Sequence, residues 1–208
     1  MSLFVTIEGP EGSGKTSAMR IVKEKLENVG YSVVTTREPG GTEIGEQIRN
    51  VILDPKNTEM DSRTEALLYA ASRRQHLIEK IWPSLKEGKI VFCDRYLDSS
   101  LAYQGIARGL GVEQILEVNS YATEGTFPDL TVLFDIDPLL GLERINKNKN
   151  REVNRLDMEK ISFHKQVRNG YLELSRRFPD RYFVVDASLP LEEVSSVVFE
   201  KITEMLRR

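Results

Sequence analysis

The chain has 208 residues, with 29 basic and 32 acidic side chains and a formal net charge of −3. This length favours one domain, residues 1–208, and the charge provides no general attraction to nucleic acid, so we expect no nucleic-acid partner. Cys93 is the only cysteine, which excludes an internal disulfide and favours a reducing compartment. The apolar runs are too short to span a bilayer, and no leader segment precedes the first apolar run. We therefore expect a cytoplasmic protein without a membrane partner.

Short apolar segments alternate with segments of helical periodicity along the chain. The sequence predicts strands at residues 3–7, 31–35, 90–94, 129–136 and 181–187. It predicts helices at residues 18–29, 44–52, 65–81 and 191–206, and Pro83 is expected to end or kink the third. This alternation is typical of an α/β fold with a parallel sheet covered on both faces. Ligands of such sheets bind beyond the carboxyl ends of the strands.

A glycine-rich loop lies between the first strand and the first helix. The segment 9–16 fits the phosphate-loop pattern of Gly, four residues, Gly-Lys and then Ser or Thr. Its backbone N–H groups and the helix N-terminus would hold the phosphates of ATP. We expect ATP to contact Gly9, Pro10, Glu11, Gly12, Ser13, Gly14, Lys15, Thr16 and Ser17.

Two oxygen-bearing side chains are candidates for binding Mg²⁺. The Thr16 hydroxyl follows the loop lysine, and Asp94 ends the apolar strand "IVFCD". In phosphate-loop proteins these positions supply a hydroxyl ligand and an acidic residue for the metal ion. The alternative for Asp94 is a turn residue or helix cap.

Arginines gather near the predicted strand ends and loops. They are Arg37, Arg49, Arg73, Arg74, Arg95, Arg151 and Arg155. Arginine clamps phosphate bidentately and stabilises a phosphoryl group during transfer, so a second phosphate-bearing substrate is expected. The nearest match to a guanine-reading motif, "NKNKN" at 146–150, has asparagine where the aspartate is needed. The pattern therefore favours a nucleotide kinase over a GTPase switch.

Five motifs together carry a resemblance to a known family. "FVTIEGPEGSGKTS", "TREPGGT", "RTEALLYAASRRQH", "CDRYLDSSLAYQG" and "NRLD" resemble the bacterial thymidylate kinases, from residue 4 to about residue 186. The resemblance implies transfer of the γ-phosphoryl group of ATP to dTMP, giving dTDP and ADP for dTTP biosynthesis. It also implies a phosphate-loop NTPase three-layer fold with a five-stranded parallel sheet, helices on both faces, a mobile lid at about 146–158, and a homodimer.

The resemblance also implies a set of site residues. The dTMP contacts would come from Glu11, Glu38, Pro39, Arg49, Tyr69, Arg73, Arg95, Ser100, Tyr103 and Gln104. Catalytic charge would come from Lys15, Arg95, Arg151 and Arg155, with the last two in the lid. No arginine lies among the variable residues of the phosphate loop, so this charge has to come from elsewhere, and Arg155 is slightly preferred. Adenine is expected near residues 186–188.

Other readings of the same residues remain open. Tyr69 and Tyr103 at helical spacing would otherwise be core residues, and no role is assigned to His76 or His164. A kinase for another nucleoside monophosphate, or for a deoxynucleoside with Glu38 as general base, uses the same fold. A nucleotide-dependent switch protein is the alternative from a different class.

Overall fold

The sheet is parallel and has five strands. The structure is a computed structural model that describes residues 2–147 and 155–207. The strands pair in the order β2-β3-β1-β4-β5. Their bounds are β1 Leu3–Glu8, β2 Val33–Arg37, β3 Ile90–Asp94, β4 Leu130–Asp135 and β5 Tyr182–Asp186. The five predicted strands are thus confirmed, although the second begins and ends two residues later than predicted.

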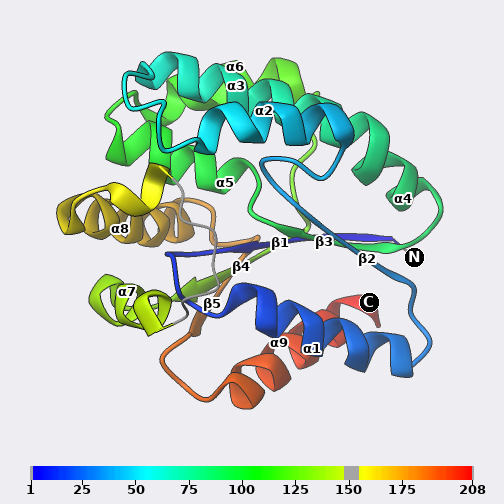
Figure 1. Cartoon of the computed structure of the whole chain (residues 1–208). Coiled ribbons are helices and arrows are strands. Elements are labelled where there is room, and N and C mark those ends of the chain that lie inside the picture. The colour runs from blue at the N-terminus through cyan, green and yellow to red at the C-terminus, as the bar shows by residue number, and fades with distance from the viewer. Residues whose placement is uncertain (1, 148–154, 208) are drawn as a thin grey trace.

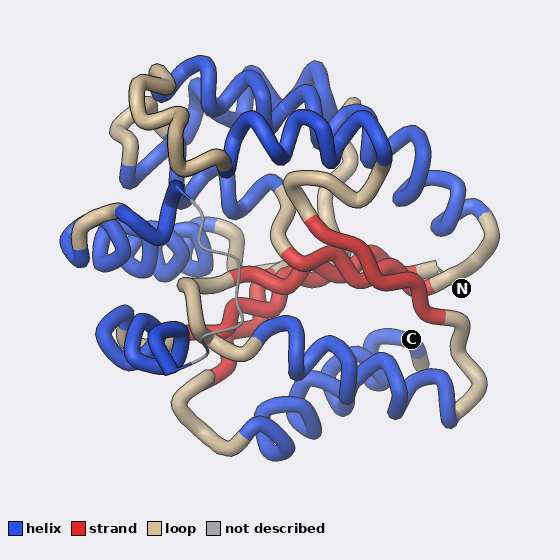
Figure 2. The backbone as a smooth tube through the Cα atoms, viewed as in Figure 1, coloured by secondary structure: helices blue, strands red, loops and turns tan. Residues whose placement is uncertain are grey.

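Helical segments connect the strands and cover the sheet. Their bounds are α1 Lys15–Asn28, α2 Glu43–Leu53, α3 Ser62–His76, η1 Leu77–Ile81, α4 Trp82–Lys86, α5 Leu97–Ser100, η2 Leu101–Ala107, α6 Val112–Thr123, α7 Pro138–Lys147, η3 Arg155–Met158, α8 Ile161–Arg177 and α9 Leu191–Leu206. Figure 1 shows α1 and α9 on one side of the sheet and α3, α5 and α6 on the other. Figure 2 shows the strands as the middle of three layers.

Side chains of successive strand residues enter two separate cores. Val5 and Ile7 of β1 pack with α1 and α9, whereas Phe4 packs with the helices of the opposite face. This follows from the two-residue repeat of a strand, because alternate side chains point to opposite faces. Strands buried on both faces are nearly continuously apolar, which explains why the sequence predicted them. The predicted α/β fold with helices on both faces is confirmed.

Two helical features need a comment. The chain stays helical around Pro83, but the regular helix α3 ends at His76, and Pro83 lies in the first turn of the next regular helix, α4. The widened turn of η1 precedes it. The segments α5 and η2, directly after β3, lie where the alternation of strands and helices predicts a helical connection, but the sequence did not predict their bounds. None of the helices in the described part of the chain is long and apolar enough to cross a membrane.

A buried ion pair holds α5 against the sheet. Asp98 is fully buried, and Arg181 donates to its two oxygens at 2.6 and 2.7 Å. The Thr131 hydroxyl in β4 donates to the same carboxylate at 3.2 Å. The pair therefore links the start of α5 to β4 and to the segment before β5.

Replacing Asp98→Ala is expected to lower the free energy of unfolding by about 3 kcal/mol, because the partly buried Arg181 loses its counter-charge and Thr131 loses an acceptor. Urea unfolding followed by circular dichroism measures the change. Glu24→Ala is the matched control, since the exposed Arg20–Glu24 pair at 3.0 Å should contribute less than about 1 kcal/mol. Equal losses in the two variants would contradict the assignment.

Candidate active site

The phosphate loop surrounds the ammonium group of Lys15. Gly12 and Gly14 adopt φ angles of 72° and 83°, and a Cβ atom on Gly12 would lie 2.1 Å from the Gly141 carbonyl oxygen. Lys15 Nζ donates to the carbonyl oxygens of Gly9 at 3.0 Å and Pro10 at 2.8 Å. Burial, with a smaller effect of Arg95, lowers the pKa of Lys15 to about 8. An incoming phosphate would restore the preference for the ammonium form.

The two predicted magnesium ligands lie together. The Thr16 hydroxyl, in the first turn of α1, donates to Asp94 Oδ2 at 3.0 Å, and Asp94 ends β3. Both side chains line the same pocket. Hydroxyl and carboxylate oxygens beside a phosphate loop are the donor set that Mg²⁺ prefers. These residues therefore fit the ion.

Arg95 has an uncommon backbone conformation and a crowded side chain. Its φ angle is 69°, which costs a non-glycine residue about 1–3 kcal/mol. Its guanidinium group donates to Glu11 Oε1 at 2.6 Å and to the hydroxyls of Ser99 at 3.2 Å and Tyr171 at 3.0 Å. It also lies 5.2 Å from the centre of the Tyr103 ring. These contacts hold the guanidinium next to the phosphate loop.

Glu8 lies behind Arg95 and orients both hydroxyls. Its carboxylate accepts from Ser99 Oγ at 2.6 Å and from Tyr171 Oη at 2.9 Å. Because the hydroxyl hydrogens point to Glu8, their lone pairs can face Arg95. Burial, and then the charge of Asp98, raise the pKa of Glu8 to about 7. The sequence analysis missed Glu8, Ser99 and Tyr171, because nothing in their spacing distinguishes them from core residues.

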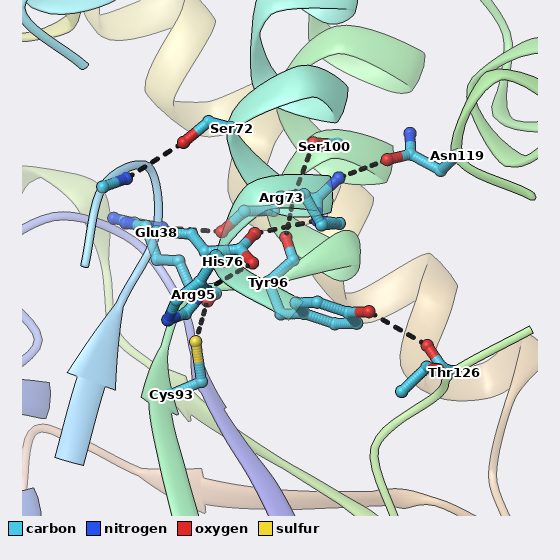
Figure 3. Close-up of polar contacts among 12 residues, drawn as sticks. Glu38, Ser72, Arg73, His76, Cys93, Arg95, Tyr96, Ser100, Asn119 and Thr126 are labelled. Carbon is cyan, nitrogen blue, oxygen red and sulfur yellow. Dashed lines mark hydrogen bonds and ion pairs between the residues drawn. The ribbon is translucent and has the colours of Figure 1, made fainter. Parts of the chain in front are cut away.

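The guanidinium group of Arg73 is completely buried and anchored on several sides (Figure 3). It donates to Glu38 Oε2 at 2.8 Å, to the Tyr96 carbonyl at 2.9 Å and to Ser100 Oγ at 3.1 Å. The Asn119 side chain accepts a further bond. Arg73 is thus fixed at the wall of the pocket that it lines.

The other oxygen of Glu38 contacts His76. His76 Nδ1 lies 2.9 Å from Glu38 Oε1, and Nε2 lies 2.6 Å from Thr36 Oγ1. Cys93 is close enough to complete a cluster of potential metal ligands within 4.8 Å. However, Arg73 already lies against the same carboxylate, and both nitrogens of His76 are hydrogen-bonded. We therefore interpret this cluster as a hydrogen-bond network of the core.

One pocket brings together the predicted acceptor residues, except Ser100, which lies behind Arg73. Its lining includes Glu11, Glu38, Pro39, Arg49, Tyr69, Arg73, Arg95, Tyr103 and Gln104, together with Thr16 and Asp94. The pocket is therefore continuous with the proposed magnesium ligands. Residues that the sequence analysis had not assigned to the acceptor also line it, namely Arg37, Leu53, Tyr96, Ser99 and Leu156.

Two further hollows adjoin the phosphate loop. Residues 11–17 line one with Asp94, Arg95 and Arg144. Ser13, Gly14 and Ser17 line the next, with Ala187 and Ser188 after β5. Arg144 of α7 donates to the Ala187 carbonyl at 2.9 Å and was missed by the sequence analysis. The predicted adenine segment thus adjoins the loop. Gly9 and Pro10 line neither hollow and instead hold Lys15.

Of the two predicted lid arginines, the structure describes only Arg155, which does not lie at the phosphate loop. Arg151, and most of the predicted lid at 146–158, lie outside the described residues. Arg155 is buried, donates to the Ile52 carbonyl at 3.1 Å and pairs with Glu65. It does not line the hollow around the loop. The catalytic roles of Arg151 and Arg155 stay predictions.

Glu8 makes stability fall as pH rises from about 4.5 to 7. In this window the folded chain keeps the Glu8 proton that the unfolded chain has lost, so folding becomes less favourable by on the order of 3 kcal/mol. Urea unfolding of the wild type and of Glu8→Gln across this range measures the effect. The wild type should lose stability relative to the variant. A stability difference that is constant or rises with pH would rule out the raised pKa.

Comparison with known proteins identifies the family. The family model described as thymidylate kinase matches residues 7–198. The thymidylate kinase of Geobacillus sp. strain WCH70 is 58% identical over 203 residues, covering 98% of this chain and 97% of that protein. A crystal structure of thymidylate kinase from Ehrlichia chaffeensis has a TM-score of 0.75 and 32% identity, and covers 99% of this chain and 98% of that chain. The chain belongs to the thymidylate kinase family.

Proposed function

We propose that the chain transfers the γ-phosphoryl group of ATP to dTMP, giving dTDP and ADP for dTTP biosynthesis. The observation that carries this proposal is the pocket that joins the phosphate loop and Asp94 to Arg95, Arg73 and Gln104. A phosphate loop alone indicates nucleotide binding. A second pocket that opens onto its catalytic side provides for an acceptor.

The donor nucleotide would lie along the phosphate loop. Lys15 holds the β- and γ-phosphates as a buried cation, and Ala187 and Ser188 provide the surface for adenine. Thr16 and Asp94 would hold Mg²⁺, which neutralises charge on the β- and γ-phosphate oxygens when bound. Transfer then depends on in-line positioning and charge neutralisation, with Arg95 between donor and acceptor. A phosphate monoester is already anionic at neutral pH, so no general base is assigned.

The acceptor base would be held between Tyr69, Arg73 and Gln104. Arg73 supplies a fixed donor for a base carbonyl, and Gln104 Oε1 is a buried acceptor without a partner among the described residues. Thymine offers a carbonyl and an imide N–H on one edge, which match these two groups. Pro39 and Tyr69 would contact its methyl group. Tyr103, whose hydroxyl donates to Glu11 at 3.3 Å, would lie beside the sugar and disfavour a 2′-hydroxyl.

The geometry of Glu38 argues against a deoxynucleoside kinase that uses this residue as base. Its carboxylate is buried, and its oxygens contact Arg73 at 2.8 Å and His76 at 2.9 Å. A base that deprotonates a 5′-hydroxyl has to reach that hydroxyl directly. Another monophosphate as acceptor is the remaining alternative within enzymes.

We also propose a cytoplasmic homodimer with one domain per chain, residues 1–208, and a lid at about 146–158. Large apolar side chains on neighbouring helical segments are exposed, including Val51 of α2, Leu67 of α3 and Ile78 of η1. A second copy would cover such a surface.

Acceptor dependence tests the function. ADP release from ATP with Mg²⁺ is expected to be fast with dTMP, slower with dUMP, and weak with dCMP, AMP, GMP and thymidine. The dTMP to dUMP ratio should be about 10- to 200-fold, the discrimination that one methyl group in an apolar niche provides. Faster turnover with another monophosphate would refute the assignment of the base. ADP release independent of any acceptor would favour a switch protein.

Lys15 should take up protons when ATP binds near pH 8. Because its pKa is about 8 without ligand, about 0.5 proton is expected to bind as the phosphates stabilise the ammonium form. Isothermal titration in buffers of different ionisation enthalpy measures this uptake. Lys15→Arg is the control, since arginine does not titrate there. The same uptake in that variant would assign the proton to another group.

A further inference from the structure

Gln104 places an unpaired oxygen in the acceptor pocket. Its side chain is buried in η2, and its amide nitrogen donates to Glu65 Oε1 at 2.8 Å. The amide oxygen is buried and has no partner among the described residues, although Gln104 lines the pocket. Buried polar atoms are nearly always hydrogen-bonded, so this oxygen indicates a donor on the ligand.

Glu65 allows only this orientation of the Gln104 amide. Glu65 is buried in the first turn of α3, pairs with Arg155, and lies 3.5 Å from Arg108. Burial raises the pKa of Glu65, but the hydrogen bonds from Arg155 and Gln104 outweigh it and lower the pKa below its ordinary value. An ionised carboxylate only accepts hydrogen bonds. If the amide turned over, two acceptor oxygens would face each other.

We infer that Glu65 is a positioning residue that selects the pyrimidine class of the acceptor by fixing the Gln104 amide. The inference rests on the proposed function. Thymine and uracil carry an imide N–H at the ring position where cytosine carries an acceptor nitrogen. A Gln104 oxygen directed into the pocket accepts from the imide and repels cytosine. Glu65 does not line the pocket and therefore acts through Gln104.

The substitution Glu65→Gln should turn the Gln104 amide over, so that its NH₂ group faces the pocket. The carbonyl oxygen of the new amide is expected to accept the hydrogen bond from Arg155, because the guanidinium group can only donate. The NH₂ group of the new amide then faces Gln104, which turns its own oxygen toward it. Gln104 consequently presents NH₂ to the pocket, and this donor matches the ring nitrogen of cytosine. The change removes one charge and preserves the size of the side chain.

The ratio of kcat/KM for dTMP to kcat/KM for dCMP measures the effect. We expect this ratio to fall about 10- to 100-fold in Glu65→Gln, the range for placing a buried hydrogen-bonding group opposite the wrong partner. The loss for dTMP should appear mainly in KM. An unchanged ratio in a folded variant would overturn the inference.

Two controls separate amide orientation from general loosening of the pocket. The dTMP to dUMP ratio should stay unchanged in Glu65→Gln, because both bases carry the imide. Arg108→Gln removes a charge that lies 3.5 Å from Glu65. In the described part of the chain, no side-chain hydrogen bond joins Arg108 to Gln104, so this variant should leave the dTMP to dCMP ratio unchanged. A change of the dTMP to dUMP ratio in Glu65→Gln as large as that of the dTMP to dCMP ratio would overturn the inference. An equal fall of the dTMP to dCMP ratio in Arg108→Gln would also overturn it.

Wild-type turnover of dTMP tests the proposed function separately. If turnover is absent, affinities for dTMP, dUMP and dCMP from calorimetry provide the same two ratios. If Glu65→Gln does not fold, side-chain amide exchange in the ¹⁵N-labelled wild type is decisive. A Gln104 amide proton that faces Glu65 should exchange slowly before dTMP is added. Two rapidly exchanging protons would mean that the NH₂ group faces the pocket, which contradicts the inference.

Discussion

Buried carboxylates in and behind the pocket wall determine the direction of the polar groups that line the pocket. Glu8 accepts from the two hydroxyls that contact Arg95, Glu38 binds Arg73, and Glu65 binds the amide of Gln104. Each carboxylate accepts from the group that it contacts and thereby fixes the direction of that group's donor. The side chains on the pocket wall are consequently set before any ligand arrives. Such preorganisation is the main means by which phosphoryl-transfer sites stabilise charge.

The free-energy cost of burying these carboxylates is lower for Glu38 and Glu65 than for Glu8. Glu38 and Glu65 each contact an arginine, which compensates the loss of hydration. Among the described residues, Glu8 at the carboxyl end of β1 accepts hydrogen bonds from hydroxyl groups and a backbone N–H rather than from a cation, and its pKa rises to about 7. The charge of Arg95 opposes this rise, because it favours the ionised form of Glu8. The strained backbone of Arg95 is a second local cost at this edge.

The sequence predicted the parts of the molecule that depend on local chemistry. Apolar strands, the phosphate loop and Asp94 follow from composition and spacing, and the resemblance to the family supplied Arg73 and Gln104. The roles of Glu8, Glu65 and Tyr171 could not be predicted from the sequence, because they depend on contacts between residues 39 to 163 positions apart in the chain. Spacing could not predict where the helix before Pro83 changes, namely that α3 ends at His76 and the widened turn of η1 precedes α4. Arg144 was missed for the same reason as Glu8, since only the fold brings α7 to the segment after β5.

The position of Arg155 bears on the last residues of the predicted lid, which form η3. The sequence analysis placed Arg155 at the transferring phosphate, whereas the structure places it against Glu65, with the neighbouring Leu156 lining the acceptor pocket. One carboxylate therefore contacts both the residue that would read the base and the first residues of η3. Any change at Glu65 reaches both groups, because the two partners share its two oxygens. In this structure Arg155 and Leu156 thus lie on the acceptor side of the site, while Lys15 and Arg95 line the hollow at the phosphate loop, and the catalytic role of Arg155 stays a prediction.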